Sequence, residues 1–449
     1  MPSGKKSKID RTTFKALLWT AVAGLIFGLI GFGEIAEDLL RTFRNSLHWH
    51  KASGQIVLVK IDDEALRQVG RWPWPRRNHA QMTDALTKAG AKRIFFDISF
   101  FGATNSADDR QFAEALERSR RVVLAMRIRR SNTAGVQDVY PLPAIASTPL
   151  ATIDWQYNWQ NAVWQIPYSL ERGGRPVPSF ASLLSGRSGA VNSTFMPDYS
   201  IDPKSIPSIS AARILQGQFD PAFVRGRDVV VGTDSDGIGD QYFLPGTGKM
   251  GGSYVHIIGA ETLKSGTPHY WGWLPLFLAS LGVAALALTR RNHLQQTVLI
   301  AGWVLALLFG PAALEARLIF LDITPGLFVT CIIAVILVRR LIRHRGLVNA
   351  VSGLPNLNAL RANRAGRDQA LIVARVLNYA DVVAALPTDS ERQLVEQIIS
   401  RLSIGSSDRT FYQGDGGIFA WFEEPRKPFG HHIDALYALF RNPIRVANL

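Results

Sequence analysis

Four long apolar runs, nearly free of charged residues, stand out in the pattern of the chain. They lie at residues 16–36, 271–289, 296–315 and 318–342. Each run is close to the roughly 20 apolar residues that a helix needs to cross the hydrocarbon core of a bilayer. The pattern therefore predicts four transmembrane helices, one near the N-terminus and three close together after the middle of the chain.

The region between the first two runs, residues 40–268, has a different pattern. Short apolar runs at 55–63, 92–100 and 121–128 are separated by amphipathic helical patterns, and another apolar run begins at 227. Buried strands that alternate with helices are typical of parallel α/β units. The fold class predicted for this region is an open α/β sheet.

Acidic residues follow several of these predicted strands. In an open α/β sheet, the loops at the carboxyl ends of the strands line the usual ligand crevice. We therefore expect that some of these side chains, with one arginine, line a ligand pocket. The candidate pocket residues are Asp62, Asp63, Arg76, Asp97, Asp234 and Asp240.

No metal site is predicted at these loops. The spacing that begins at Asp234 and Asp236 starts like a calcium-binding loop. However, Ile238 replaces the third ligand, and Pro245 stands where the closing glutamate belongs.

The stretch RWPWPRR, residues 71–77, combines two tryptophans with two prolines. One interpretation is a cation or carbohydrate site built on Trp72 and Trp74. The other is a rigid turn that packs large aromatic rings at the start of a helix. The sequence leaves both interpretations open.

A formal net charge of +14 could indicate a nucleic-acid partner. Many of the basic residues instead flank the apolar runs, in the tail 1–15, at Arg290 and Arg291, and at 339–345. Because cytoplasmic loops of membrane proteins carry the positive excess, we expect cytoplasmic termini, an exterior region 40–268 and no nucleic-acid partner. The single cysteine, Cys331, excludes a disulfide framework within the chain.

Three stretches carry a resemblance to a known family. They are IVLVKIDDEAL at 56–66, GRWPWPRRNHAQMTDALTKAGAKRIFFDISF at 70–100 and VVVGTDSDGIGDQYFLPG at 229–246. With the apolar runs that follow, they closely resemble the second type of CHASE domain, a sensory module outside the cytoplasm in bacterial signalling proteins. The resemblance implies a multi-pass protein of the bacterial inner membrane, an unidentified extracytoplasmic ligand and a homodimer.

Residues 346–449 carry a second resemblance. SGLPNLNAL at 352–360, an apolar strand near 370, a helix at 390–402 and GDGGIFAWF at 414–422 follow in the order of a GGDEF domain, the diguanylate cyclase fold. A helix and the start of another strand are expected after residue 430. The last part of the family's fold is missing, so this is a partial α/β domain.

The resemblance also implies that the chemistry of cyclases is lost. Such enzymes need carboxylates to hold divalent metal against the triphosphate of GTP. The family's metal-binding Asp of the first strand falls near Arg375, and its guanine contacts fall near Val383 and Ala384. The five signature positions of the hairpin are occupied by Asp415, Gly416, Gly417, Ile418 and Phe419.

Two acids of that signature thus become Gly417 and Ile418. We expect a degenerate domain with no catalytic residue, no metal and no obligatory cofactor, leaving open GTP or cyclic di-GMP as a regulatory ligand. Three functions remain open: a receptor that signals through this domain, the N-terminal part of a phosphodiesterase whose EAL domain lies beyond residue 449, and an interaction platform.

Overall fold

The computed structural model of the chain describes most of its residues. They are 11–131, 135–139, 145, 147–158, 160–290, 292–363, 369–387, 390–403, 409–423 and the single positions 434, 438 and 441. The chain forms two compact units, Met1–Cys331 and Ile332–Leu449.

The first unit is built on a seven-stranded sheet with the order β12-β2-β13-β3-β4-β5, in which β6 pairs with β4. All pairs are parallel except β4 with β5. The predicted α/β sheet is therefore confirmed. Its strands are β2 (Ile56–Ile61), β3 (Arg93–Phe96), β4 (Val122–Ser131), β5 (Gly135–Val139), β6 (Leu150–Thr152), β12 (Ser208–Ser210) and β13 (Asp228–Thr233).

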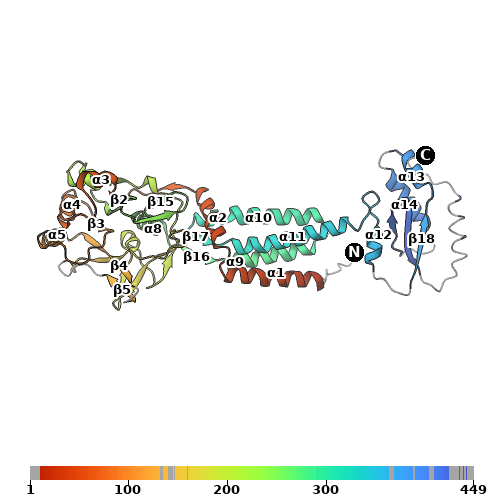
Figure 1. The fold of residues 1–449 in the computed structure, drawn as a ribbon, viewed down its shortest axis with the longest axis horizontal. Helices are drawn as coiled ribbons and strands as arrows, with labels where there is room; N and C mark the ends of the chain where they lie inside the picture. The colour runs from red at the N-terminus through yellow and green to blue at the C-terminus, as the bar shows by residue number, and fades with distance from the viewer. Residues whose placement is uncertain are drawn as a thin grey trace, which may run out of the picture. The chain divides into compact units, whose positions relative to one another are not determined.

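Helices cover both faces of this sheet (Figure 1). Successive residues of a strand point to opposite faces, so Val57 and Val59 join one core while Ile56 and Leu58 join the other. The first core is closed by α3 (Asp63–Val69), α4 (Arg76–Lys88), α5 (Ser106–Ser119) and α7 (Ala211–Leu215). The second is closed by α6 (Phe180–Ser185) and α8 (Gly252–Ser265).

Short strand pairs and turns complete the α/β part of the first unit. The parallel pair is β1 (His50–Lys51) with β11 (Ile201–Asp202). The antiparallel pairs are β7 (Ile166–Pro167) with β10 (Thr194–Phe195), β8 (Ser169–Arg172) with β9 (Arg175–Pro178), and β14 (Gln241–Leu244) with β15 (Gly248–Gly251). Two 3-10 turns lie at Pro203–Ser205 and Pro221–Phe223.

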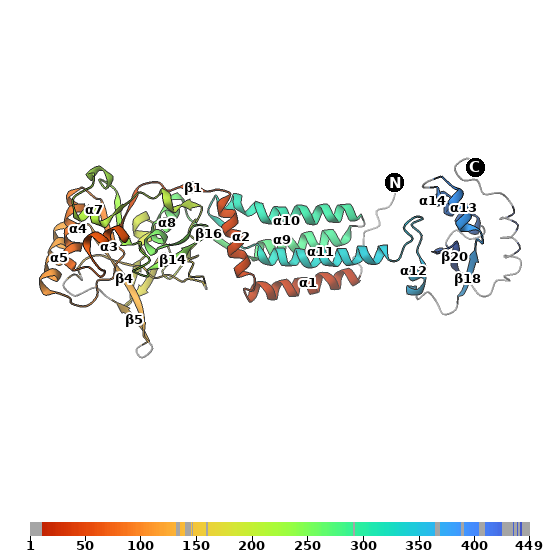
Figure 2. The same ribbon diagram turned by 45° about the horizontal axis from the view of Figure 1, so that its top comes forward.

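The apolar helices are α1 (Arg11–Leu29), α9 (Leu274–Thr289), α10 (His293–Glu315) and α11 (Thr324–Arg345). In both views α1, α9 and α10 run side by side, and α11 begins beside them (Figures 1 and 2). Among the described residues, α10 and the part Thr324–Ile342 of α11 are each long and apolar enough to span a membrane. A third candidate span is present only if α1 and the following helix, Glu34–Ser46, are counted together as one bent span. Helix α9 is apolar but shorter than these candidate spans.

The first predicted span, 16–36, differs from the structure at its end. Helix α1 stops at Leu29, and α2 (Glu34–Ser46) begins after a bend of 81°. Gly31 lies in this bend with φ +65, a conformation that glycine adopts at little cost. Residues 34–36 therefore belong to a separate helix.

Two other predicted spans, which were expected to begin at 271 and 318, also begin later in the structure, with α9 at Leu274 and α11 at Thr324. The chain forms the parallel strand pair β16 (His269–Gly272) and β17 (Ile319–Leu321) before α9 and α11 begin. Backbone groups at these positions pair with each other in the strands, so the helices start later than hydropathy alone predicts.

The second unit contains a three-stranded antiparallel sheet in the order β18-β20-β19. Its elements are α12 (Leu357–Ala362), β18 (Ala370–Arg375), α13 (Tyr379–Ala385), α14 (Glu391–Leu402), β19 (Tyr412–Gly414) and β20 (Ile418–Glu423). The core joins Leu394 and Ile398 of α14 to Phe419 and Trp421 of β20. The strand, helix and hairpin expected here are present, while the helix and strand expected after 430 lie outside the described residues.

Candidate functional site

A large cavity lies beside the carboxyl ends of β3 and β13 in the first unit. Its volume is about 1040 Å³, at the upper end of the range that is usual for small-molecule sites. The segments that follow β3, β6 and β13 and the start of α4 supply its walls. This position matches the crevice expected for an open α/β sheet.

Three of the six candidate pocket residues line this cavity: Arg76, Asp97 and Asp240. The other three have local partners. Asp62 caps α3 by accepting from the Ala65 N–H at 2.9 Å, and it accepts from the Ser210 hydroxyl at 2.7 Å. Both bonds are accepted by the same oxygen, Oδ1, and Asp62 does not line the cavity.

The two remaining carboxylates are also engaged nearby. Asp63 accepts from the Ser235 hydroxyl at 2.6 Å. Asp234 lies 3.6 Å from the Lys60 ammonium group. Neither lines the cavity, so the structure does not bring all six residues to one pocket.

Arg76 lines the cavity, but its guanidinium is engaged in the wall. It forms an ion pair with Asp109 at 2.7 Å and donates to the carbonyl oxygens of Phe101 and Gly102 at 3.2 and 2.7 Å. Asp109 also accepts hydrogen bonds from the backbone N–H and the hydroxyl of Thr104. Burial acts to raise the pKa of Asp109, but the hydrogen bonds from Thr104 and the charge of Arg76 lower it below its usual value. Arg76 therefore fixes the loop that follows β3.

Asp97 is the most enclosed acid of the cavity, with 7% of its surface exposed. It accepts a hydrogen bond from the Ser253 hydroxyl at 2.7 Å. Burial raises the pKa of Asp97 to about 6, partly offset by the Ser253 bond. Any side chain at Gly232 would collide with Ser253, since an added Cβ would lie 1.8 Å from its hydroxyl oxygen.

Asp240 is half-buried and accepts from the Thr233 hydroxyl at 3.0 Å. Burial raises the pKa of Asp240 to about 6, and the negative charge of Asp97 raises it further, against smaller opposite effects of Thr233, His256 and Arg127. The two acids thus act on each other electrostatically. No ion pair joins Asp240 to a basic side chain within the described part of the chain.

Two buried histidines near the cavity were not found from the sequence. The ring of His256 lies with Nε2 3.7 Å from Asp97, but burial lowers the pKa of His256 to about 3, so this ring is neutral. His79 lines the cavity, and burial lowers its pKa to about 3 as well. The Nδ1 atom of His79 has no hydrogen-bond partner in the described structure. Nothing in their sequence spacing marks either histidine as a pocket residue.

Aromatic rings form the other walls. Trp155 and Tyr242 lie edge to face with their centroids 5.0 Å apart, and Tyr157 lies 6.4 Å from Tyr242. At the other end, Trp74 donates its indole N–H to the Gly70 carbonyl at 2.8 Å and packs edge to face with Trp72. The stretch RWPWPRR is therefore a packed turn whose rings also line the cavity.

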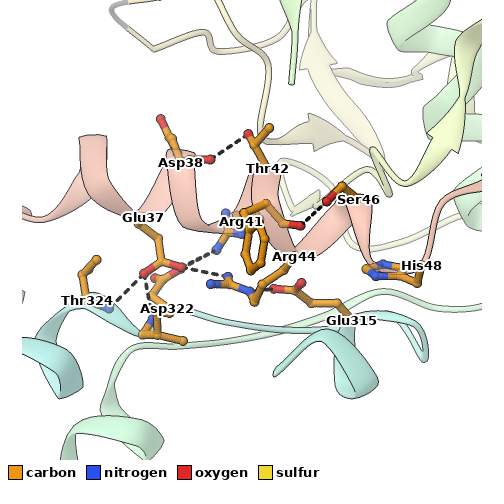
Figure 3. A network of polar contacts seen from close by, with 12 residues as sticks. Glu37, Asp38, Arg41, Thr42, Arg44, Ser46, His48, Glu315, Asp322 and Thr324 are labelled. Carbon is orange, nitrogen blue, oxygen red and sulfur yellow. Dashed lines mark hydrogen bonds and ion pairs between the residues drawn. The ribbon is translucent and has the colours of Figure 1, made fainter. Parts of the chain in front are cut away.

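A buried polar network lies where α2 meets the apolar helices (Figure 3). The guanidinium of Arg44 pairs with Glu315 of α10 at 2.8 Å and with Glu37 at 2.9 Å. The other oxygen of Glu37 accepts from the backbone N–H groups of Ile323 and Thr324 at the start of α11. Arg44 and Glu315 have fully buried side chains.

Helix α2 also contacts the residue that follows β17 and the α/β part of the first unit. Arg41 forms an ion pair with Asp322 and lies over the ring of Trp164, 5.2 Å from its centroid. Asp38 accepts from the Asn158 amide at 2.7 Å. One short helix therefore contacts α10, the start of α11 and the α/β part of the first unit.

The cavity and this network share one segment of the chain. Residues 153–157 line the cavity, and the next residue, Asn158, binds Asp38 of α2. A shift of the cavity wall would therefore act directly on α2.

In the second unit, the hairpin turn Asp415–Gly417 has φ values of +65 at Gly416 and +77 at Gly417. An added Cβ at Gly417 would lie 2.4 Å from Cβ of Tyr379. Strand register places Arg375 opposite Ile418. Within the described residues, no group of three or more His, Cys, Asp or Glu side chains is arranged to hold a metal ion.

Comparisons with known proteins identify one family. No curated protein and no solved structure matches the chain. The family model described as the CHASE2 domain matches residues 17–289, more than half of the chain. Because this match includes the sheet, the cavity and the helices α2 and α9, the chain belongs to the CHASE2 family of extracellular sensor domains.

Proposed function

We propose that the chain is a transmembrane sensory receptor that binds an extracytoplasmic ligand in the cavity and passes the signal to residues 346–449. The observation that carries this proposal is the large cavity at the strand ends of a CHASE2 sensor domain. The receptor lies in the bacterial inner membrane, crosses it four times with both termini in the cytoplasm, and works as a homodimer. The basic flanks of the apolar runs support this orientation.

The coupling route runs from the cavity through residues 153–158 to α2. Since α2 binds Glu315 of α10 and the start of α11, a small movement of α2 would change the packing of both helices. Interfaces of this kind switch between discrete arrangements and so carry signals across membranes.

The cavity can be tested with the full-length protein in detergent. A library of small charged and neutral metabolites is screened for compounds that raise the unfolding temperature. Ser99→Trp, a half-buried cavity residue, fills the cavity and should abolish every true shift. If no compound stabilises the wild type more than Ser99→Trp, the cavity is not the ligand site.

The coupling route has its own test. Hydrogen exchange of residues 34–46 is compared with and without the stabilising compound. Asp38→Ala removes the bond to Asn158 and should preserve binding while it abolishes the change in exchange. Glu34→Ala, on the exposed side of the same helix, is the matched control and should behave as wild type. Equal responses in both variants would contradict the route.

We propose further that residues 346–449 are a degenerate GGDEF-like domain that serves in cyclic di-GMP signalling without cyclase activity. The strand order and the glycine turn support a cyclase-like hairpin. The cation of Arg375 opposite Ile418 opposes metal binding where the cyclase reaction needs carboxylates.

Turnover and binding separate the possible outputs. The full-length protein with GTP and magnesium should form no cyclic di-GMP, and calorimetry with GTP and cyclic di-GMP shows whether the domain binds nucleotide. Formation of cyclic di-GMP would contradict the proposal that the domain has lost cyclase activity. A longer reading frame that encodes an EAL domain would support the phosphodiesterase alternative.

A further inference from the structure

The strongest unexplained feature of the cavity is a pair of acids with no cationic partner. Asp97 is buried, and its neighbours are the Ser253 hydroxyl and the neutral ring of His256. The carboxylate of Asp240 accepts a hydrogen bond from the Thr233 hydroxyl. A buried carboxylate is unfavourable unless it is paired or protonated. The site therefore has negative charge that the protein itself does not balance.

The only basic side chain of the described cavity lining besides Arg76 is Arg127. Arg76 is engaged by Asp109 and two carbonyl oxygens. Arg127 is exposed and forms no ion pair with either acid in the described structure. Its charge lowers the pKa of Asp240 only as a weak effect. Neither arginine forms an ion pair with Asp97 or Asp240 among the described residues.

The walls next to the acids suit a positive group. Trp155, Tyr157 and Tyr242 lie together, and aromatic faces attract ammonium groups, most strongly where water is excluded. The unpartnered Nδ1 of His79, in a ring that is 2% exposed, offers a further polar atom on the cavity lining. A cation between acids and rings would satisfy both features.

We propose that the cavity binds a small organic cation, an amine or quaternary ammonium, through Asp97 and Asp240. The three aromatic rings contact the carbon atoms around its nitrogen. This inference rests on the proposed function and adds the chemical class of the ligand. A divalent metal fits less well, since no group of three or more ligating side chains is present among the described residues.

The experiment measures binding of choline, tetraethylammonium and 1,4-diaminobutane to the full-length protein in detergent by calorimetry at pH 7.5. The uncharged analogue of choline, 3,3-dimethylbutan-1-ol, and the anion succinate are the ligand controls. At least one cation should bind, and the neutral alcohol should bind at least tenfold more weakly. Equal binding of choline and the alcohol would overturn the proposal, as would failure of all three cations to bind.

Variants locate the site. Asp240→Asn should lower the affinity for the cation at least tenfold. Asp97→Asn should have the same effect, while its side-chain oxygen still accepts a hydrogen bond from Ser253. Asp236→Asn changes an exposed acid on the same loop that does not line the cavity, and it should bind as wild type. If Asp97→Asn does not fold, Asp240→Asn alone decides. Unchanged affinity in Asp240→Asn would contradict the proposal.

Protonation gives an independent readout. Because burial raises the pKa of both acids to about 6, cation affinity should fall as the pH drops from 7.5 to 5. The other charged and titratable groups around the two acids are Arg76, Arg127, Asp154, His79, His256, Tyr157 and Tyr242. Burial lowers the pKa of both histidines to about 3, so their rings are neutral over this range, and Asp154 forms an ion pair with Arg172. A constant affinity over this range would contradict binding through the two carboxylates.

The two proposals fail differently. If only succinate or a neutral metabolite binds, and Ser99→Trp abolishes that binding, the proposed receptor function stands and the proposal of a cationic ligand is wrong. If no compound of any class binds in a way that Ser99→Trp abolishes, the proposed ligand site itself is lost.

Discussion

Asp97 is a carboxylate that folding removes from water without giving it a cationic partner. Its pKa is raised to about 6 by burial, so the folded protein holds this proton more tightly than the unfolded chain does. The contribution to stability is therefore present below about pH 4 and is lost as the pH rises through about 6. The same sign applies to Asp240.

Asp97→Asn should remove this dependence. We expect the variant to unfold at a higher temperature than wild type at pH 7.5, and the difference to shrink at pH 4.5, where the wild-type carboxyl is protonated. Scanning calorimetry of the detergent-solubilised protein measures it. Ser253 keeps its acceptor in the variant, and Asp236→Asn serves as the exposed control. A difference that does not change with pH would contradict the raised pKa.

Single residues also show how far a sequence can locate a site. Asp97 and Asp240 were placed in a pocket because they follow strands, and the structure puts them on one cavity. Asp62 has the same local pattern but caps α3 and binds Ser210, a partner 148 positions away. His79 and His256 have no distinguishing local spacing, so their role depends on packing that a single sequence does not reveal.

At the scale of elements, α2 connects the α/β part of the first unit with the apolar helices α10 and α11. The predicted span 16–36 included its first three residues, because hydropathy does not show the 81° bend between α1 and α2. Hydropathy also does not show that Arg41 and Arg44 have ion-pair partners far along the chain. The partners Glu315 and Asp322 lie about 270 to 280 positions further along the chain. Strands β2, β3, β4 and β13, in contrast, were predicted from their own apolar runs, whereas β5, β6 and β12 were not predicted.

Removing one partner of this network should be strongly destabilising. Arg44→Met leaves Glu315 buried without its ion-pair partner and leaves Glu37 with only Arg41, 4.0 Å away, at a cost of about 3 to 5 kcal/mol. The double variant Arg44→Met/Glu315→Leu removes the unpaired charge of Glu315 and should recover part of that loss. Thermal unfolding of the full-length protein in detergent measures both.

The matched control for this network is Arg392→Met, which breaks an exposed pair with Glu396. Such surface pairs contribute about 0 to 1 kcal/mol, so the control should unfold close to wild type. If Arg44→Met were as harmless as Arg392→Met, the network would not hold α2 in place.

At the scale of the whole molecule, the sequence predicted a sensor, membrane helices and a small second unit, and the structure has an α/β unit with apolar helices and a second sheet. The number of membrane crossings is the least predictable part. Helix α9 has 16 residues, about 24 Å at 1.5 Å per residue, which is shorter than the roughly 30 Å hydrocarbon core. Strand β16 (His269–Gly272) takes up the first two residues of the predicted span 271–289.

Cysteine labelling in whole cells counts the crossings. In a Cys331→Ala background, we expect Gln218→Cys and Arg317→Cys to react with a membrane-impermeant maleimide. Asn292→Cys and Asp381→Cys should react only after the cells are permeabilised, because basic flanks hold these loops inside. All four positions are exposed. Labelling of Asn292→Cys in intact cells would mean that α9 does not cross the bilayer.

The ion pairs of α2 have a consequence for how the protein is made. A ribosome releases Glu37, Arg41 and Arg44 long before it synthesises Glu315 and Asp322. During that interval α2 cannot form its ion pairs with Glu315 and Asp322. We therefore expect α2 to dock only after α10 and the start of α11 have been made. Newly made chains that stop before Glu315 should keep α2 open to proteases.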